Sequence, residues 1–286
     1  MDGKTYRNDL YMITALSNMH VGSGDINFGV VDNLVQKDLI TSVPVINSSG
    51  IKGAFREFFN ASGDIDDHEI DYIFGPPQKA GKDGKKRSGS GMYKFFIANL
   101  LTLSARSSKK PFFRATAPML LKEFLNNVEL FKIGIAQKEI IEKLIDNAAP
   151  EKGKPVILEN LGNDLIIEDF MAVYKPFDNV NGLESVLGCD VAIFHDDDFK
   201  ELCENLPVIA RNHLENGKSQ NLWYEEIVPR QSRFYFIVAV PYSEDTKDIN
   251  QKFSNHLQDN LIQIGANASI GYGFTEIKRI NDQEGQ

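Results

Sequence analysis

One histidine and three aspartates lie close together near the start of the chain, in the stretch HVGSGDINFGVVDNLVQKD from His20 to Asp38. Carboxylates and imidazoles act as general acids, general bases and metal ligands. Because glycines interrupt the stretch, it is either a hairpin turn or part of an active site. On residue type alone, Asp32 is best interpreted as a turn residue that bonds its own backbone. Asp25 follows a glycine and suits a turn, and His20 is the type of residue that fixes its own loop.

A second chemical signal is a helix N-terminus that could hold a phosphate. Ser48, Ser49 and Gly50 lead into an amphipathic segment. The unpaired N–H groups and partial positive charge at such an end attract anions. Lys52 and Arg56 lie one turn apart on this segment, so both can face the same anion. Capping by the serines, with two ordinary surface charges, is the alternative interpretation.

A third cluster, HDDD at residues 195–198, contains metal-ligating residue types. Adjacent residues rarely converge on one ion, and a helical pattern follows. We therefore expect these aspartates to occupy the positive end of a helix.

Basic residues are concentrated in one window of an acidic chain. The net charge is −9, but residues 79–114 hold ten basic residues and one acid, so this window carries +9 and the rest of the chain −18. The ten are Lys79, Lys82, Lys85, Lys86, Arg87, Lys94, Arg106, Lys109, Lys110 and Arg114. The asymmetry indicates either one basic face for a polyanion or a solvated loop whose lysines resist aggregation.

The composition excludes several classes of protein. The 286 residues are 42% hydrophobic and 25% charged, as is usual for a globular chain, and no apolar stretch has the length of a bilayer span. The first ten residues lack the apolar core of a secretory signal. Cys189 and Cys203 do not form a disulfide framework. We expect a cytoplasmic protein with no membrane partner.

The elements that must position these residues occur in a simple order. We predict a strand at 9–17, a helix from residue 48 and a strand at 92–104, then a strand at 232–242, a helix at 247–261 and a strand at 273–280. The order strand, helix, strand occurs twice, which gives the β-α-β-β-α-β order of an α+β, ferredoxin-like (RRM-like) fold. We expect one such domain over residues 1–286, with insertions at about 62–232 that include a basic loop (76–92) and a helical insertion (117–148). The aromatic motif of RNA-recognition modules is missing, so RNA would be held by loops.

Several motifs also occur together in a fixed order. They are HVGSG (20–24), GVVD (29–32), VQK (35–37), VPVI (43–46), IKGAFR (51–56), FGPP (74–77), SARSSKKPFFRATAP (104–118), LWYEEIVPRQSRFYF (222–236) and IQIGANASIGYGF (262–274). In combination they resemble the backbone subunits of type III-B CRISPR effector (Cmr) complexes, within the RAMP superfamily of ferredoxin-like RNA-binding proteins. The resemblance covers most of the chain and is loosest at about 125–205. Two departures, in the order of Ser48-Ser49-Gly50 and in Ala266 after Gly265, alter how closely an RNA backbone can approach.

The resemblance implies an RNA-guided ribonuclease that forms a filament on guide RNA and cuts complementary target RNA at regular intervals. It implies Asp32 as the catalytic residue and as ligand of a divalent metal, Mg²⁺ or Mn²⁺. One carboxylate plus substrate phosphate is a usual way to hold Mg²⁺. Residues 205–230 look like the family's thumb, a hairpin that wedges into the guide–target duplex. His20, Tyr224 and Glu226 are further catalytic candidates.

The remaining candidates are expected to bind RNA. They are Ser49, Gly50, Lys52, Arg56, Lys85, Lys86, Arg87, Arg106, Arg114, Gly265, Gly271 and Gly273. The glycines would let the main chain lie against a sugar-phosphate path, although tight turns explain them almost as well. The implied partners are guide (crRNA) and target RNA, the other subunits of the type III-B effector, and further copies of the chain along the guide.

Two alternatives remain open at this level. The first is a purely structural guide-RNA-binding RAMP subunit, of type III-A or III-B, without cleavage. The second is a free-standing RNA-processing endonuclease of the same superfamily, which the lack of a convincing histidine pair disfavours.

Overall fold

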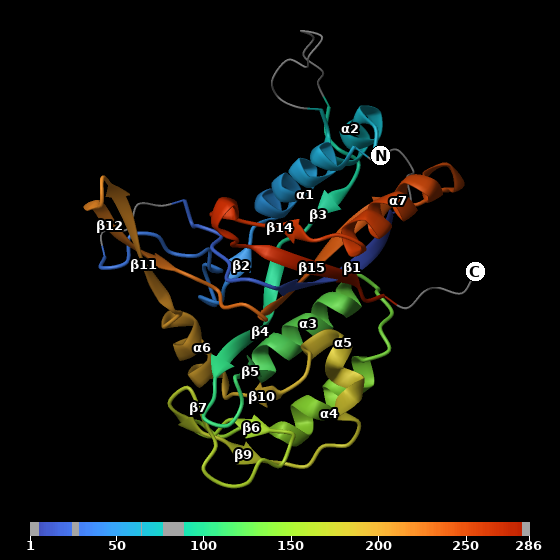
Figure 1. Cartoon of the computed structure of the whole chain (residues 1–286). Helices are drawn as coiled ribbons and strands as arrows, with labels where there is room; N and C mark the ends of the chain where they lie inside the picture. Colours follow the sequence, from blue (N-terminus) through green and yellow to red (C-terminus); the bar gives the residue numbers. More distant parts are fainter. Residues whose placement is uncertain (1–5, 25–28, 64, 77–88, 282–286) are drawn as a thin grey trace.

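The computed structural model describes residues 6–24, 29–63, 65–76 and 89–281. Within these ranges the chain has a mixed α+β fold, built on an 11-stranded sheet that contains antiparallel and parallel pairs (Figure 1). The α+β class expected from the sequence is therefore confirmed. Among the helices described, none is long and apolar enough to cross a membrane.

Four long strands form the centre of the sheet. They lie in the order β15 (Phe274–Arg279), β1 (Tyr6–Ala15), β13 (Arg233–Pro241) and β4 (Ala98–Arg106), and every neighbouring pair is antiparallel. The pairing of β1 with β13 is the longest, from Tyr6 opposite Pro241 to Thr14 opposite Arg233. The first strand of the chain is thus enclosed by the last two long strands.

Shorter strands extend the sheet on both sides. Beyond β4 come β5 (Phe112–Thr116), β10 (Val191–Ile193), β6 (Val156–Ile157) and β9 (Val173–Tyr174), while β14 (Ile262–Gln263), β2 (Val45–Ile46) and β3 (Lys94–Phe95) pair with β15, β4 and β13. Strands β7 (Ile166–Ile167) and β8 (Phe170–Met171) form a separate small sheet. The sheet beyond β4 is therefore made of short pieces drawn from the middle of the chain.

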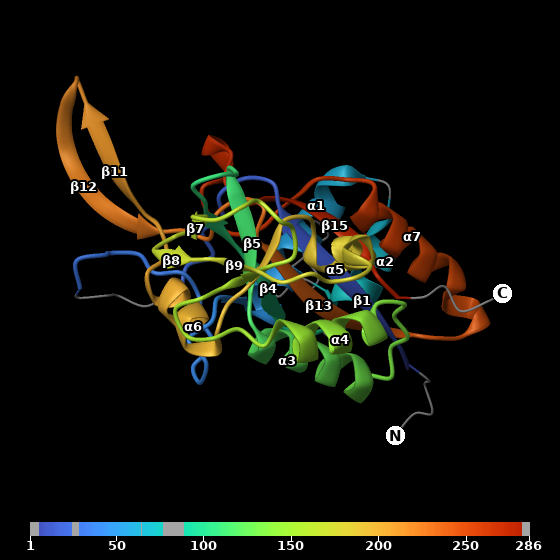
Figure 2. The same ribbon diagram turned by 90° about the horizontal axis from the view of Figure 1, so that it is seen from below.

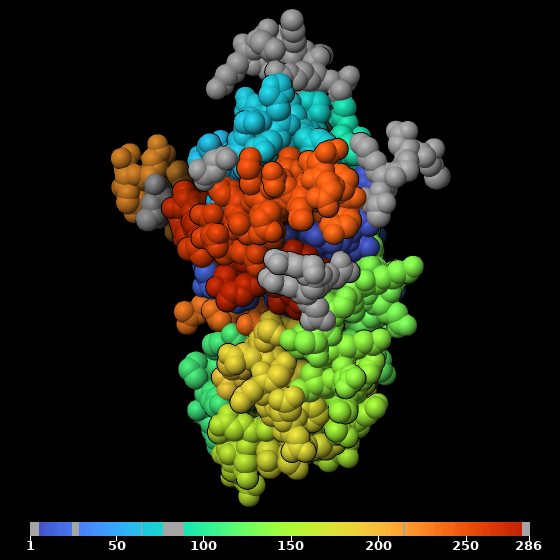
Figure 3. Space-filling view, turned by 90° about the vertical axis from the view of Figure 1, so that its right-hand side faces the viewer, coloured from blue at the N-terminus to red at the C-terminus, as the bar shows by residue number. Residues whose placement is uncertain are grey.

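Helices cover the central sheet on both faces (Figures 1 and 2). On one face lie α1 (Ser48–Ser62), α2 (Asp67–Phe74) and α7 (Lys247–Gln258), and on the other lie α3 (Pro118–Leu130), α4 (Lys138–Ala148) and α5 (Glu184–Leu187). The short 3₁₀ helices are η1 (Val180–Leu183), η2 (Glu244–Thr246) and η3 (Ala268–Ile270). Figure 3 shows the green-to-yellow residues of α3, α4 and α5 gathered below the orange surface of α7.

Strand β1 shows why both faces need a cover. Tyr11 and Ile13 pack into the cluster with α1 and α7, whereas Leu10 and Met12 pack into the cluster with α3 and α4. Successive side chains of a strand point to opposite faces. A continuous apolar run such as LYMI is therefore buried on both sides, as in a sheet that lies between two helical layers.

A two-stranded hairpin projects from the body in both views (Figures 1 and 2). It consists of β11 (Val208–Glu215) and β12 (Lys218–Glu226), joined at Asn216 and Gly217, whose φ angles are 51° and 78°. Two consecutive residues with positive φ are typical of the tight turn that matches strand twist. The hairpin lies within the segment 205–230 that the resemblance associates with a thumb, and we call it the thumb hairpin.

The HDDD cluster begins α6 (Asp196–Glu204), as the sequence predicted. The side chain of His195 accepts a hydrogen bond from the backbone N–H of Asp197 and caps the helix. The part of the chain that the structure describes contains no group of three His, Cys, Asp or Glu residues placed to hold a metal ion. The interpretation of HDDD as a helix start is confirmed.

Phe253 of α7 lies at the centre of the aromatic cluster under α1 and is fully buried. Its ring lies 5.0 Å from that of Tyr93 and 5.4 Å from that of Phe59. We expect Phe253→Ala to lower the free energy of unfolding by about 3–5 kcal/mol. Leu130→Ala, at a side chain that is 74% exposed, should change it by less than about 0.5 kcal/mol. Urea unfolding of both variants checks this, and equal losses would contradict the assigned core.

Candidate functional site

Asp32 lies on the surface beside the foot of the thumb hairpin. Its Oδ2 atom accepts a hydrogen bond from the backbone N–H of Tyr224, at 2.7 Å. The backbone N–H groups of Asp32 and Asn33 donate to the carbonyl oxygen of Tyr224, at 3.0 and 3.1 Å. The carboxylate is therefore not bonded to its own turn. One oxygen is fixed by strand β12, and Oδ1 has no hydrogen-bond partner within the described ranges.

The other two aspartates of this region differ from Asp32. Asp38 bonds its own turn: its Oδ1 accepts from the backbone N–H groups of Ile40 and Thr41, at 3.0 and 2.8 Å. The hydrogen bond from Thr41 is the main cause that lowers the pKa of Asp38. Asp25 lies outside the described residues. Of the two aspartates that the structure describes in this region, Asp32 is exposed and Asp38 is half-buried.

His20 and Glu226, predicted as catalytic candidates, are buried, with 5% and 3% of their surfaces exposed. His20 Nδ1 lies 2.7 Å from the carbonyl oxygen of Glu226, so this nitrogen donates. The Glu226 carboxylate accepts from Lys37 Nζ at 2.8 Å and from the backbone N–H of Val35 at 3.0 Å. Both side chains hold loops together. Neither can reach a polynucleotide on the surface in this conformation, which corrects the prediction for them.

Tyr224, the remaining catalytic candidate, is 39% exposed. Its backbone is the partner of Asp32, and its side chain lies opposite Ala210 on the thumb hairpin. Because side chains two positions apart on a strand point to the same face, Tyr224 shares a face with Leu222, which is 54% exposed. The hairpin therefore presents an apolar, partly aromatic face next to Asp32.

The foot of the hairpin also contains a buried polar cluster that the sequence did not indicate. Arg211 Nη2 lies 3.3 Å from Glu225 Oε1, and Asn267 Nδ2 donates to the same oxygen at 2.6 Å. The guanidinium of Arg211 lies 4.3 Å from the centre of the Tyr272 ring. We call Arg211, Glu225, Asn267 and Tyr272 the latch. The sequence signal for this cluster was the pair of adjacent glutamates, Glu225 and Glu226, in the WYEE motif. Their partners lie outside the motif, so the cluster could not be recognised from it.

Helix α1 begins at Ser48 with Asn47 as its N-cap, and no side chain caps it. The alternative interpretation, capping by Ser48 and Ser49, is therefore wrong, because both residues already lie in the first turn. Ser49 is exposed and Gly50 is half-buried, so the backbone of this turn is accessible.

The two basic residues of α1 have different surroundings. The Arg56 guanidinium lies 3.7 Å from the carboxylate of Asp71 on α2. Lys52 is half-buried and makes no ion pair or hydrogen bond with the residues that the structure describes. Lys52 is thus the cation of this helix that remains available to an anion.

Two basic residues of the predicted basic face, Arg106 and Lys110, form ion pairs within the described ranges. The Arg106 Nε and Nη2 atoms donate hydrogen bonds to Glu168 Oε2, at 2.8 and 2.6 Å. These bonds raise the pKa of Arg106. Lys110 contacts Glu159 and Asp190. Lys85, Lys86 and Arg87 lie outside the described residues. Lys94 and Lys109 are exposed and make no ion pair within the described ranges, so a basic surface in this window stays a prediction.

Arg114 is a clear correction to the predicted RNA contacts. It is 8% exposed, and it donates to the Cys189 carbonyl oxygen at 2.9 Å and to Gln231 Oε1 at 2.8 Å. Removal from water lowers the pKa of Arg114. A buried guanidinium with these partners supports the sheet between β5 and the loop before β10, and it cannot track RNA from there.

The three glycines of the last loop serve different purposes. A Cβ on Gly265 would lie 2.5 Å from the His20 carbonyl oxygen, and one on Gly273 would lie 2.1 Å from the Ile264 carbonyl oxygen. Close packing within the chain therefore requires these two glycines. Gly271, with φ of +82°, has open space around its Cβ position and is exposed. Of the three, Gly271 is the glycine where a ligand backbone can approach freely.

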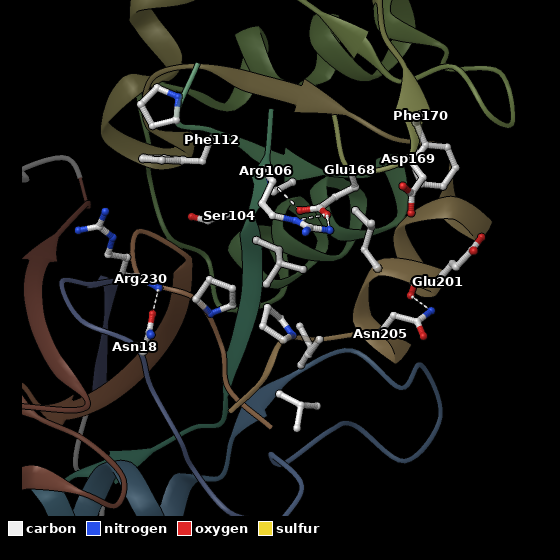
Figure 4. Close-up of a pocket in the computed structure, with 18 residues that line it drawn as sticks. Asn18, Ser104, Arg106, Phe112, Glu168, Asp169, Phe170, Glu201, Asn205 and Arg230 are labelled. Carbon is white, nitrogen blue, oxygen red and sulfur yellow. Dashed lines mark hydrogen bonds and ion pairs between the residues drawn. The ribbon is translucent and has the colours of Figure 1, made fainter. Parts of the chain in front are cut away.

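A cleft of about 570 Å³ lies at the other side of the hairpin foot (Figure 4). Its lining includes Pro207 and Val208, where the hairpin begins, together with Phe112, Phe170 and the Arg106–Glu168 pair. Asp32 is not among the lining residues. The exposed carboxylate and the cleft are therefore separate features of the hairpin foot.

Comparisons with known proteins find one family and one relative that cover most of the chain. The model of the RAMP superfamily matches residues 12–276. The CRISPR system Cmr endoribonuclease Cmr4 of Pyrococcus furiosus is 29% identical over 295 residues, covering 96% of this chain and 95% of that protein.

Solved structures share the fold. A type III-B Cmr-beta complex bound to cognate target RNA contains a chain that superimposes with a TM-score of 0.77 at 20% identity, covering 96% of this chain and 97% of that one. Oligomeric Cmr4 from Pyrococcus furiosus superimposes with a TM-score of 0.70 at 20% identity, covering 98% and 100%.

Replacing two glycines by alanine separates close packing from backbone strain. Gly271→Ala should lower the free energy of unfolding by about 1–2 kcal/mol, the cost of an L-residue at positive φ. Gly265→Ala adds a clash with the His20 carbonyl, so we expect a loss of about 3 kcal/mol or more. Thermal unfolding of the two variants measures the difference. Equal losses would show that His20 and Gly265 are not in close contact.

Proposed function

The chain belongs to the RAMP superfamily, and from that premise we propose that it is the guide-RNA-binding backbone subunit of a type III-B CRISPR effector. In this role, copies of the chain form a filament on guide RNA in a cytoplasmic ribonucleoprotein and cut complementary target RNA at regular intervals, as an antiviral defence. The observation that carries the cleavage is the exposed Asp32 carboxylate, held by the Tyr224 backbone at the foot of a projecting hairpin.

Relatives support two parts of this proposal, RNA cleavage and assembly with RNA. One similar protein is named an endoribonuclease, and the match spans nearly the full length of both chains. One similar structure is an oligomer, and another is a complex bound to target RNA. A chain with this fold is therefore compatible with self-association and with an RNA partner.

We further propose that the central sheet is a ferredoxin-like palm. The order β15-β1-β13-β4, with α1 between β1 and β4 and α7 between β13 and β15, is the order of the split β-α-β arrangement. Residues between β4 and β13, including the α3–α4 layer and the thumb hairpin, would then be insertions into one domain. Since helices cover both faces, RNA is bound by loops at the sheet ends.

The chemistry asks little of the protein. The 2′-hydroxyl of RNA attacks the adjacent phosphorus in line, the P–O5′ bond breaks, and a 2′,3′-cyclic phosphate and a 5′-hydroxyl result. Asp32 assists by accepting the hydroxyl proton through its unpartnered oxygen or by helping to hold a metal. A bound Mg²⁺ or Mn²⁺ would be held by Asp32 with phosphate oxygens of the RNA and would neutralise charge at that phosphate.

The thumb hairpin supplies the geometry for this reaction. Its exposed Leu222 and Tyr224 give it an apolar wedge that can enter between base steps. Unstacking frees the sugar-phosphate at that step from the A-form helix. Because the Tyr224 backbone also orients Asp32, the unstacked step and the carboxylate lie at the same place.

A purely structural guide-binding subunit is the second candidate function. It is favoured by the burial of His20 and Glu226, which leaves Asp32 without a second carboxylate or imidazole from the predicted set. The two functions differ in what Asp32 does, so one variant distinguishes them.

We expect Asp32→Asn in the complex reconstituted with guide RNA to cleave labelled target at least about 100-fold more slowly, because the base or metal ligand is lost. Target binding should stay unchanged. Glu142→Gln, which alters an exposed carboxylate on α4, is the matched control. The assay is run with and without Mg²⁺. Full cleavage by the Asp32 variant at every interval would leave Asp32 no essential role, whereas a wild-type complex that binds target without cutting it would support the structural function.

Lys52 is proposed to contact guide-RNA phosphate at the start of α1. Lys52→Ala should weaken guide binding and reduce the slope of log K against log salt by about 0.7, the value for one phosphate contact on a single strand. Lys143→Ala, at an exposed lysine of α4, should leave the slope unchanged. Filter binding at several salt concentrations gives both slopes. An unaltered slope for Lys52→Ala would place the guide elsewhere.

A further inference from the structure

The latch joins both strands of the thumb hairpin to the C-terminal glycine loop. Glu225 lies on β12 of the thumb hairpin, Arg211 lies on β11, and Asn267 and Tyr272 lie on the C-terminal glycine loop. A single atom, Glu225 Oε1, receives both the Arg211 guanidinium and the Asn267 amide. The hairpin is therefore fastened to the glycine loop through one carboxylate.

Because Glu225 and Arg211 are largely removed from water, the latch depends on the presence of both charges. The side chains of Glu225 and Arg211 are 5% and 17% exposed. In such surroundings, loss of one charge leaves the other buried without its partner, which is strongly unfavourable. Two apolar residues of similar volume would stabilise a fold equally well. A buried ion pair at this place is better explained by the orientation that it fixes than by the stability that it adds.

What the latch orients is the segment that carries Asp32. Asn33 forms a parallel bridge with Glu225, and the backbone N–H of Glu226 donates to the Asn33 carbonyl oxygen at 2.9 Å. The Asp32 carboxylate itself accepts from the residue before Glu225, Tyr224. A displacement of Glu225 in β12 is thus passed directly to Asp32.

On the other side, the latch holds the glycine loop in a defined conformation. Asn267 has φ of +66° and accepts a hydrogen bond from the backbone N–H of Tyr272 across the loop, at 3.2 Å. The next residue back, Ala266, donates to the His20 carbonyl oxygen at 2.9 Å. The glycine loop, the segment after His20 and the hairpin foot therefore form one hydrogen-bonded unit.

We propose that Glu225 is a positioning residue, which sets Asp32 and the thumb hairpin in a fixed relation to the glycine loop. The inference rests on the proposed function in one respect: if the glycine loop holds guide RNA, the latch fixes the place of cleavage relative to the guide. Glu225 touches neither RNA nor the reacting atoms and acts through the backbone of residues 32–33 and 224.

The test compares variants of the latch with a matched variant of another buried carboxylate. Glu225→Ala removes both contacts, and Glu225→Gln keeps an acceptor for Asn267 but removes the charge that faces Arg211. The control is Asp9→Asn. Asp9 is 1% exposed and pairs with Arg7 and Arg279, far along β1 from the latch.

The first measurement needs no activity. Hydrogen exchange of peptides from residues 29–38 reports the backbone bonds to Tyr224, and the single tryptophan, Trp223, reports the hairpin foot by its fluorescence. We expect Glu225→Ala to exchange these amides at least about 10-fold faster and to shift the Trp223 emission. Glu225→Gln should be intermediate, and Asp9→Asn should match the wild type in both signals.

The second measurement is target cleavage by the reconstituted complex. A small displacement of a reacting group costs up to about 100-fold in rate, so Glu225→Ala should lower kcat by about 10–100-fold. KM and guide affinity should stay within about twofold. The proposal would be overturned if the amides of Glu225→Ala exchanged at the wild-type rate. It would also be overturned if Asp9→Asn changed amide exchange and kcat as much as Glu225→Ala does. Faster exchange in a complex whose wild type does not cleave would establish the latch and overturn the proposed function.

Discussion

Main-chain hydrogen bonds between residues 32–33 and strand β12 hold the Asp32 carboxylate at the foot of the thumb hairpin. Main-chain pairing is independent of side-chain rotamers, so the position of the carboxylate depends on the register of the two segments. Everything that fixes the register of β12 therefore fixes Asp32 as well. The ion pair of Lys37 with Glu226 and the contacts of Glu225 both act in this way.

The double-sided core explains why chemistry is confined to the ends of the sheet. Residues of β1, β13 and β4 are buried alternately under α1 and α7 or under α3 and α4. Neither face of the central strands is left for a ligand. The polar groups with a proposed role, Asp32, Lys52 and the backbone near Gly271, belong to loops or to the N-terminal part of helix α1. A rigid centre with functional loops at its rim is a common solution, because the centre fixes the loop ends.

The fold class and the core elements could be predicted because their signals are local. The apolar run of β1 and the helical pattern of α1 depend on neighbouring residues, and α3 begins at Pro118, within the helical insertion expected at 117–148. The burial of His20 and Glu226 could not be predicted, because each packs against the other's segment across 206 residues. The ion pairs of Arg106 and Lys110 could not be predicted for a similar reason. Lys110 and Arg106 meet carboxylates that are 49 to 80 residues away, outside any window in which their charge was counted.

Strand β1 is synthesised before both of its neighbours in the sheet, β13 and β15, which lie far along the chain. A nascent polypeptide thus carries the apolar segment around Leu10–Ile13 unpaired until β13 and β15 have been synthesised. Non-local pairing of this kind is slow and leaves sticky surface exposed to chaperones. A chain that ends before β12 also lacks the backbone partner of the Asp32 carboxylate.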